Sequence, residues 1–299
     1  MTGRPMKGTE KGELICSILD PTGNITALVE NCPEHLRQET AAAVMRRFPE
    51  VEQVGFFRAG SRNPSCGAEL FMAGGEFCGN ASMSAAALAL IRARERGNTP
   101  SAGREQADGG TELRLLVSGV SSPVEVRLKQ SGSDRNCFFA GVLMPPAVSI
   151  SMRGLRYGGK SGSLPVVEME GISHIVIEPS SPFFDLKEHP AEAETAVRSF
   201  CGELGADGLG LMFLEEEGDA LSLTPLVYIP GSGTVFWENS CASGSSACGM
   251  YLSAAEGRCG DRSFREPGGT LRVTSDPQRG ETWLYGTARL VGTYRLPPL

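Results

Sequence analysis

The feature that most constrains this chain is an order of predicted elements that occurs twice. In each half, strands are followed by a helix, by further strands, by a turn that contains a cysteine, and then by a helix rich in small residues. A repeat on this scale predicts two similar units. The chain has 299 residues, which is enough for two domains of ordinary size.

In the first half, Pro33 is expected to open a helix that extends to about Phe48, because proline suits the first helical turn. The alanine-rich run that starts at Ala81 predicts a second helix ending at Gly97. Residues 97–112 are rich in Gly, Pro, Ser and Asp and are expected to form a loop. Strands are predicted at 13–19, 25–30, 51–58, 68–72, 113–118, 123–128 and 137–144.

In the second half, a helix is predicted from about Pro190 to Gly202, and a small-residue helix is predicted to end at Gly257. The stretch 151–164, with its glycines and serines, is expected to mark the crossover between the units. Strands are predicted at 165–169, 173–178, 209–215, 221–229, 270–274, 281–286 and 288–294. The predicted domains are 1–148 and 149–287, with the last strand, 288–299, joining the first domain.

Composition argues against several classes of protein. The formal net charge is -7 and the basic residues are scattered, which argues against a nucleic-acid partner. No apolar run reaches transmembrane length, and residues 1–11 lack the apolar core of a signal peptide, so neither a membrane partner nor export is expected. The 9 cysteines are widely spread and fit a reducing cytoplasm better than a disulfide scaffold. No CxxC occurs and no histidine lies at zinc-ligand spacing from a cysteine, so no metal site is expected.

The two cysteine turns are the segments of the sequence most suggestive of chemistry. They are 76–81, which contains Cys78, and 239–244, which contains Cys241. A cysteine just before a helix lies beside unpaired backbone N–H groups and the positive end of the helix dipole, which stabilise a thiolate. The same N–H groups can bind a carboxylate, and small neighbours such as Gly79 and Gly244 allow close approach.

Two such turns placed face to face could invert a carbon centre. One cysteine would remove a Cα proton as a thiolate while the other delivers a proton as a thiol from the opposite face, which is general acid–base catalysis with two bases. Cysteine is more often a small buried hydrophobe, and this reading is preferred for the remaining cysteines. These include Cys16, Cys32, Cys137, Cys201, Cys248 and Cys259.

The segments EFCGNASMSAAALA and ENSCASGSSA resemble the two active-site motifs of the diaminopimelate epimerase-like superfamily. Gly23-Asn24 and the segments 52–54 and 171–174 are weaker matches to other family motifs, and all the matches occur in the same order along the chain as in the family. The resemblance implies an α+β fold of two pseudo-symmetric domains, each a curved, mostly antiparallel sheet around a central helix. It also implies an active site between the domains, an amino-acid substrate and no cofactor.

The resemblance matches Cys78 and Cys241 to the two catalytic cysteines of the family. It matches Asn24, Gly79, Asn80, Ser243 and Gly244 to positions that line the substrate site. His174 matches a histidine near that site, although a structural role is equally compatible with it. Glu238 and Glu76 are candidates to contact a polar side chain or the ammonium group, or to interact only with a helix dipole.

The sequence also departs from diaminopimelate epimerase. The segment 228–231 reads YIPG and lacks the arginine that grips a distal carboxylate there, which disfavours diaminopimelate as substrate. The GGEFCGNA turn at 74–81 and the pair Trp237-Glu238 instead resemble the histidine racemase subgroup that begins synthesis of staphylopine-type metallophores. Conversion of L-histidine to D-histidine is therefore the predicted reaction.

Three alternatives remain open from the sequence. The substrate could be diaminopimelate, proline or hydroxyproline, within the same isomerase class. The chain could be another thiol enzyme, such as a peroxidase or a hydrolase with His174 as base. It could also be an amino-acid-binding protein that retained the fold. The oligomeric state is open, with a homodimer as one option, and so is which cysteine serves which enantiomer.

Overall fold

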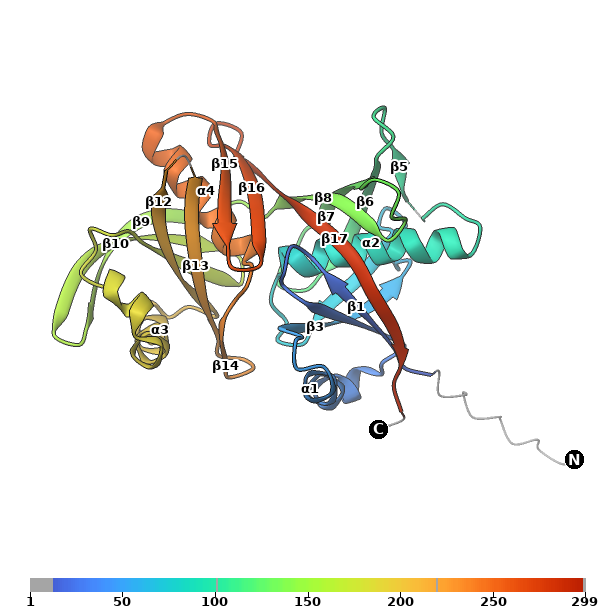
Figure 1. Ribbon diagram of the computed structural model, residues 1–299, viewed down its shortest axis with the longest axis horizontal. Helices are drawn as coiled ribbons and strands as arrows, with labels where there is room; N and C mark the ends of the chain where they lie inside the picture. The colour runs from blue at the N-terminus through green and yellow to red at the C-terminus, as the bar shows by residue number, and fades with distance from the viewer. Residues whose placement is uncertain (1–12, 101, 219, 298–299) are drawn as a thin grey trace, which may run out of the picture.

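The computed structural model describes residues 13–100, 102–218 and 220–297. The segment 1–11, from which no signal peptide is expected, lies outside the described residues. The chain forms two lobes that lie side by side, each a curved sheet with a helix inside it (Figure 1). The predicted α+β fold of two pseudo-symmetric units is confirmed. Within the described part of the chain, no helix is long and apolar enough to cross a membrane.

The strands of the first lobe form a closed ring. Each strand pairs with the next in the order β1, β2, β3, β4, β6, β7, β8 and β17, and β17 pairs again with β1. The strands are β1 (Ile15–Asp20), β2 (Thr26–Glu30), β3 (Gln53–Ala59), β4 (Ala68–Met72), β5 (Arg104–Glu105), β6 (Thr111–Val117), β7 (Val124–Gln130), β8 (Cys137–Met144) and β17 (Glu281–Arg295).

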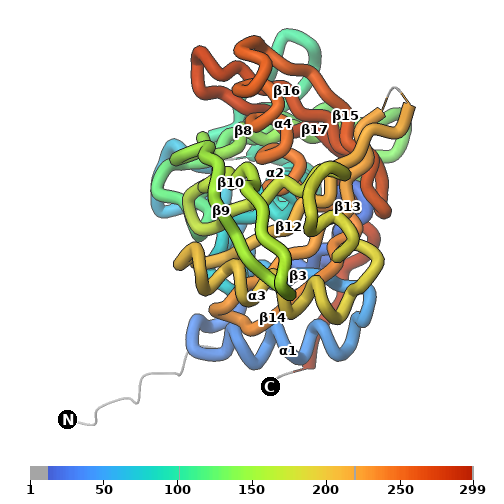
Figure 2. Tube along the Cα trace, turned by 90° about the vertical axis from the view of Figure 1, so that its left-hand side faces the viewer, coloured from blue at the N-terminus to red at the C-terminus, as the bar shows by residue number. Residues whose placement is uncertain are grey.

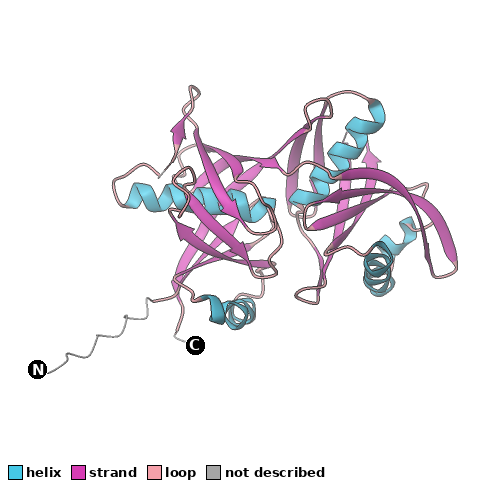
Figure 3. Cartoon of the chain, turned by 180° about the vertical axis from the view of Figure 1, so that it is seen from behind, coloured by secondary structure: helices cyan, strands magenta, loops and turns pink. Residues whose placement is uncertain are grey.

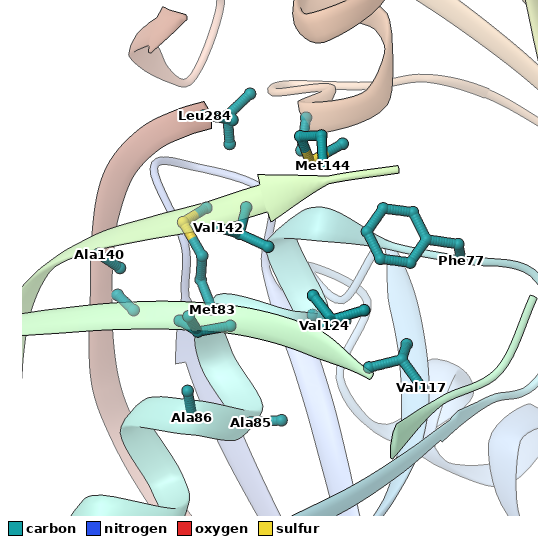
Figure 4. Close-up of a cluster of buried hydrophobic side chains, with 14 of the residues drawn as sticks. Phe77, Met83, Ala85, Ala86, Val117, Val124, Ala140, Val142, Met144 and Leu284 are labelled. Carbon is teal, nitrogen blue, oxygen red and sulfur yellow. The ribbon is translucent and has the colours of Figure 1, made fainter. Parts of the chain in front are cut away.

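Helix α2 (Gly79–Glu95) fills this ring, as the view from behind shows (Figure 3). Its small residues are buried almost all round, which is the pattern of a helix enclosed by other elements. Met83 and the neighbouring alanines face Val124 and Val142 of the surrounding strands (Figure 4). Alanine is the best helix former and occupies little volume, so the strands can close tightly around the helix.

The second lobe repeats the plan of the first. β11–β12 is a parallel pair like β2–β3, and β13–β15 is a parallel pair like β4–β6. Helix α4 (Ala242–Glu256) corresponds to α2, and α3 (Pro190–Leu204) corresponds to α1 (Arg37–Arg47). The other elements are β9 (Ser149–Tyr157), β10 (Lys160–Met169), β11 (Ile172–Ile177), β12 (Leu209–Glu217), β13 (Ala220–Ile229), β14 (Thr234–Trp237), β15 (Gly260–Glu266), β16 (Gly269–Asp276) and the 3-10 helices η1 (Glu34–Leu36) and η2 (Phe184–Glu188).

The outer helices occupy equivalent places in the two lobes. Helices α1 and α3 lie toward the same end of the molecule, outside the sheets (Figure 2).

The two lobes are joined by strands that continue from one into the other. Strand β17 pairs with β16 and β8 in its first half and with β1 from Arg289 onward. The two strands predicted at 281–286 and 288–294 are therefore one strand.

The predicted crossover at 151–164 is wrong. This stretch forms strands β9 and β10, which pair as a hairpin. Gly158 and Gly159 have φ of 56° and 77° at its turn, so the glycines serve the hairpin and not a linker. The chain passes from β8 to β9 at 145–148 instead.

The other differences concern helix starts and short strands. The first helical segment begins with η1, so that α1 starts at Arg37. Helix α2 starts at Gly79, not Ala81, because the Cys78 side chain caps it. Strands β5, β9, β14 and β15 were not predicted. β15 reads GDRSFRE, and its charged residues mask the alternation that would have indicated a strand.

The lobes are in close backbone contact at two glycines. A Cβ atom on Gly23 would lie 2.4 Å from the Gly268 Cα, and a Cβ atom on Gly268 would lie 2.8 Å from the Gly23 Cα. Neither position can therefore hold a larger residue unless the backbones separate. Asn24, a predicted site residue, directly follows this contact.

We expect Gly23→Ala to destabilise the protein more than Gly60→Ala does. Both glycines have left-handed φ, 89° and 82°, but the added Cβ meets nothing within 4 Å at Gly60. Backbone strain alone should cost about 1–2 kcal/mol at either site. The clash at Gly23 should add about 2 kcal/mol to the loss of unfolding free energy in urea. Equal losses in the two variants would contradict a tight contact between the lobes.

Candidate active site

The two predicted catalytic cysteines occupy the same position in the two lobes. Cys78 is the N-cap of α2 and its sulfur accepts a hydrogen bond from the Ala81 N–H at 3.4 Å. Cys241 is the N-cap of α4 and its sulfur accepts one from the Gly244 N–H at 3.4 Å. Each sulfur thus takes the place that a serine or aspartate oxygen usually takes at a helix start.

The N-termini of α2 and α4 lie against each other. A Cβ atom on Gly79 would lie 2.9 Å from the Ala242 Cβ, so the first turn of α2 reaches α4 without an intervening side chain. The Asn80 side-chain amide donates a hydrogen bond to the Ser240 carbonyl oxygen at 2.9 Å. The two cysteine turns are therefore fixed to each other as well as to their own helices.

Both cysteines line one small cavity of about 50 Å³. Seven predicted site residues and Glu76, whose role was left open, contribute to it. Its lining consists of Asn24, Gln53, Glu76, Phe77, Cys78, Gly79, Asn80, Ile172, Val227, Ile229, Glu238, Cys241, Ala242 and Ser243. Four larger hollows, of about 590, 730, 320 and 330 Å³, lie elsewhere on the described part of the chain and contain neither of these cysteines.

Gly244 and His174 are not among the lining residues. Gly244 directly follows the lining residue Ser243 in α4. Its N–H donates to the Cys241 sulfur, and a Cβ atom on it would lie 2.1 Å from the Met212 sulfur. His174 on β11 is completely buried, and neither ring nitrogen has a hydrogen-bond partner within the described residues. Burial lowers the pKa of His174 to about 3, so the imidazole is neutral near pH 7.

A chain of hydrogen bonds connects the Cys78 thiol to the second cysteine turn. The thiol donates to the side-chain amide oxygen Oε1 of Gln53 at 2.9 Å, and the Gln53 side-chain Nε2 donates to the Asn24 side-chain oxygen. Asn24 donates to the Glu52 carboxylate at 3.1 Å. The same carboxylate accepts from the backbone and side chain of Asn239 at 3.2 and 2.6 Å. Gln53 and Glu52 were noted in the sequence only as part of a weak family match.

Carboxylates lie near both cysteines: Glu238 and Glu266 near Cys241, and Glu238 and Glu76 near Cys78. Glu266, for which the sequence carries no local signal, accepts a hydrogen bond from the Cys241 N–H at 2.6 Å. Burial raises the pKa of the Cys241 thiol well above its usual value, and the charges of Glu238 and Glu266 add to the shift. Burial also raises the pKa of Cys78 to about 12 and the pKa of Glu238 to about 8.

This arrangement provides the groups that proton transfer at a carbon centre requires. Two thiols at helix starts can exchange protons, and the first N–H groups of the two helices are free of intrahelical partners and can hold an anion. The lining contains carboxylates and amides but no lysine or arginine. Among the described residues, no cluster of three or more histidine, cysteine or acidic side chains is arranged to hold a metal ion.

Solved structures of racemases and epimerases have the same fold. A predicted epimerase from Pseudomonas aeruginosa matches 96% of this chain and 100% of its own, with a TM-score of 0.64 and 15% identity. A hydroxyproline epimerase from Agrobacterium vitis matches 95% of this chain and 90% of its own, with a TM-score of 0.62 and 13% identity. The fold is thus that of the racemase and epimerase class.

The family model described as the histidine racemase CntK N-terminal domain matches residues 16–286, and the chain belongs to this family. Histidine racemase of Fusobacterium nucleatum is 30% identical over 244 residues, 78% of this chain and 79% of that protein. Histidine racemase of Staphylococcus aureus is 27% identical over 263 residues, 86% of each. The protein is an isomerase of the racemase or epimerase type, as predicted from its cysteine turns.

His174 offers a prediction about stability and pH. Its folded-state pKa of about 3 lies below the ordinary value of 6.5, so the unfolded chain binds a proton first as the pH falls. Stability should be intact above pH 6.5 and decline toward pH 3. Between pH 6.5 and 4.5 this group can remove about 3 kcal/mol at most.

We expect His174→Leu to remove this part of the acid sensitivity. Urea unfolding of both proteins at pH 6.5 and 4.5 should show the smaller decline in the variant. A variant that loses as much unfolding free energy as the parent over this interval would contradict a buried, neutral imidazole. The pH profile of the enzyme reaction should be the same in the two proteins, because a neutral imidazole outside the cavity transfers no proton.

Proposed function

We propose that this protein is a cofactor-independent histidine racemase in which Cys78 and Cys241 are the two acid–base groups. One observation carries the proposal: the two cysteines cap abutting helices and line one cavity. A substrate held there would have one thiol on each side. The same arrangement would not be needed for binding alone.

The helix starts supply the binding site for the substrate carboxylate. The N–H groups of Gly79 and Asn80 in α2, and of Ala242 and Ser243 in α4, belong to first helical turns and point toward the cavity end of each helix. Hydrogen bonds from such groups become stronger as negative charge moves from Cα onto the carboxylate in the transition state. Each well-placed donor is worth about 3 kcal/mol of barrier lowering.

The reaction transfers one proton in and one proton out. The thiolate of one cysteine takes the Cα proton and becomes a thiol, and the electron pair left on Cα is delocalised into the bound carboxylate. The thiol of the other cysteine then gives its proton to the opposite face of Cα and becomes a thiolate. The product has inverted configuration, and the reverse reaction starts from the exchanged protonation states.

One thiol must lose its proton before the first step. Burial holds the pKa of both thiols high in the free protein, so a neighbouring acceptor and a nearby cation are needed. Glu238 lines the same cavity as the Cys241 thiol, and burial raises its pKa to about 8, which suits it to hold a proton near neutral pH. The substrate ammonium group supplies positive charge beside the sulfurs and favours the thiolate.

Histidine suits the polar wall of the cavity. One carboxylate oxygen of Glu76 is buried without a hydrogen-bond partner among the described residues, and Glu238 lies in the same lining. Both can accept from the ammonium group or from an imidazole N–H. No guanidinium or ammonium side chain lines the cavity, so a second substrate carboxylate has no charged partner there. The curated relatives named above are histidine racemases.

Further parts of the proposal concern the whole chain. We assign residues 1–148 together with 288–299 to one domain and residues 149–287 to the other. The pairing of β17 with β1 from Arg289 onward supports the assignment of the last strand. A homodimer and a cytoplasmic location remain predictions.

We expect Cys78→Ala and Cys241→Ala each to lower kcat for histidine racemisation by at least about 100-fold. The loss of a proton-transfer group removes about 100- to 10,000-fold of rate. Cys259→Ser is the matched control, because Cys259 is an exposed free cysteine outside the cavity. A chiral assay of D-histidine measures the rate. Retention of near-normal kcat in either alanine variant would contradict the two-cysteine mechanism.

A panel of L-amino acids tests the choice of substrate. We expect inversion of histidine with a kcat/KM at least about 100-fold above that for diaminopimelate, because the distal carboxylate would be buried beside acidic side chains without a cation. Proline and hydroxyproline complete the panel. Preferential inversion of any of these three would overturn histidine as the substrate while leaving the two-cysteine reaction in place.

A further inference from the structure

We infer that Glu266 is a positioning residue for Cys241, which fixes the second cysteine turn and places a buried carboxylate behind that thiol. This inference rests on the proposed two-cysteine function and adds an unequal role for the two half-sites. It concerns a side chain outside the cavity lining. Glu266 is the last residue of β15 and is only 5% exposed.

Glu266 supplies a cap that helix α4 cannot make for itself. At many helix starts, a glutamate at the third helical position binds the N–H of the N-cap residue. In α4 this position is Gly244, where a Cβ atom would lie 2.1 Å from the Met212 sulfur. Glu266 instead reaches over from β15, accepting from the Cys241 N–H at 2.6 Å and from the Ser245 hydroxyl.

The corresponding strand of the first lobe performs a similar task with a neutral side chain. β6 pairs in parallel with β4 as β15 pairs in parallel with β13, and Ser118 comes directly after β6. The Ser118 hydroxyl donates to the Glu76 carbonyl oxygen at 2.9 Å and accepts from the Met72 N–H at 2.8 Å. Each cysteine turn is thus held from the end of the equivalent strand of its lobe, β6 or β15. The side chain that holds the turn is the neutral Ser118 in the first lobe and the carboxylic acid Glu266 in the second.

The carboxylate also affects the ionisation of Cys241. Burial raises the pKa of Glu266 to about 8, so the group becomes negative above that pH and opposes a second negative charge on the sulfur. The ionisable groups that face Glu266 are Cys241 at the N-cap of α4, Cys248 within α4, Glu238 after β14, and Glu52 of the first lobe. None of these is a cation, so the acidic character of this half-site is not neutralised by them.

Glutamine and alanine variants separate the two effects. Glu266→Gln keeps an oxygen for the Cys241 N–H and an amide that can donate to Ser245, but it carries no charge. Glu266→Ala loses both contacts. We expect Glu266→Gln to keep kcat for racemisation within about tenfold of the parent, and Glu266→Ala to lower it by about 100-fold, the order of effect of a misplaced reacting group. KM should change little in either variant.

The charge effect is measured on the free protein without substrate. Iodoacetamide is reacted at pH 9, and the alkylation rates of Cys241 and Cys78 are followed by peptide mass spectrometry. We expect both Glu266 variants to alkylate Cys241 about tenfold faster, which corresponds to a one-unit fall in its pKa. The rate at Cys78 should remain within about twofold. Ser118→Ala is the matched control and should leave the Cys241 rate unchanged.

The outcomes are distinguishable. An unchanged Cys241 alkylation rate in Glu266→Gln, or equal changes at both cysteines, would overturn the unequal role assigned to Glu266. Equal kcat losses in the glutamine and alanine variants would overturn its positioning role. Because alkylation needs no substrate, it decides the role of Glu266 even if the parent protein fails to racemise histidine, a failure that would contradict only the proposed function. If Glu266→Ala does not fold, Glu266→Gln still provides the alkylation result.

Discussion

The structure depends on the burial of two helices made of small residues, each inside a curled sheet. A ring of strands can close around α2 because alanines, serines and glycine occupy so much of its surface, and α4 is built in the same way. Burial leaves each helix start with N–H groups that need partners. Cysteine sulfurs take one of those N–H groups in each lobe, and the others remain for a ligand. The burial of α2 and α4 in the core thus also places two cysteines and unpaired N–H groups together at one candidate active site.

The lobes are held so that these two helix starts meet. Strand β17 belongs to both sheets, and the bare backbones of Gly23 and Gly268 allow the turns beside the cavity to touch. The Glu52 carboxylate then connects Asn24 of one lobe to Asn239 of the other. The cavity between the cysteines is small because backbone and short side chains form much of the contact.

The sequence was sufficient to predict the repeat, the central helices and the two cysteine turns, because each has a strong local signal. Gly257 ends α4 in the left-handed conformation, as its position after a small-residue run indicates. The hairpin of β9 and β10 was misassigned because glycine and serine are as common in tight turns as in linkers. The role of Glu266 could not be predicted, because it depends on a contact between residues 25 positions apart that only the packing of β15 on α4 creates.

The measurement that tests the central claim most directly is the fate of deuterium early in the reaction. L-histidine is added to the protein in D₂O, and substrate and product are separated and analysed for Cα deuterium before equilibrium is approached. Two cysteines on opposite faces predict that the D-histidine product carries deuterium from the acid, while the remaining L-histidine keeps its original hydrogen. Deuterium that enters the remaining substrate as fast as it enters the product would show a single base exchanging protons on one face. That result would contradict the account.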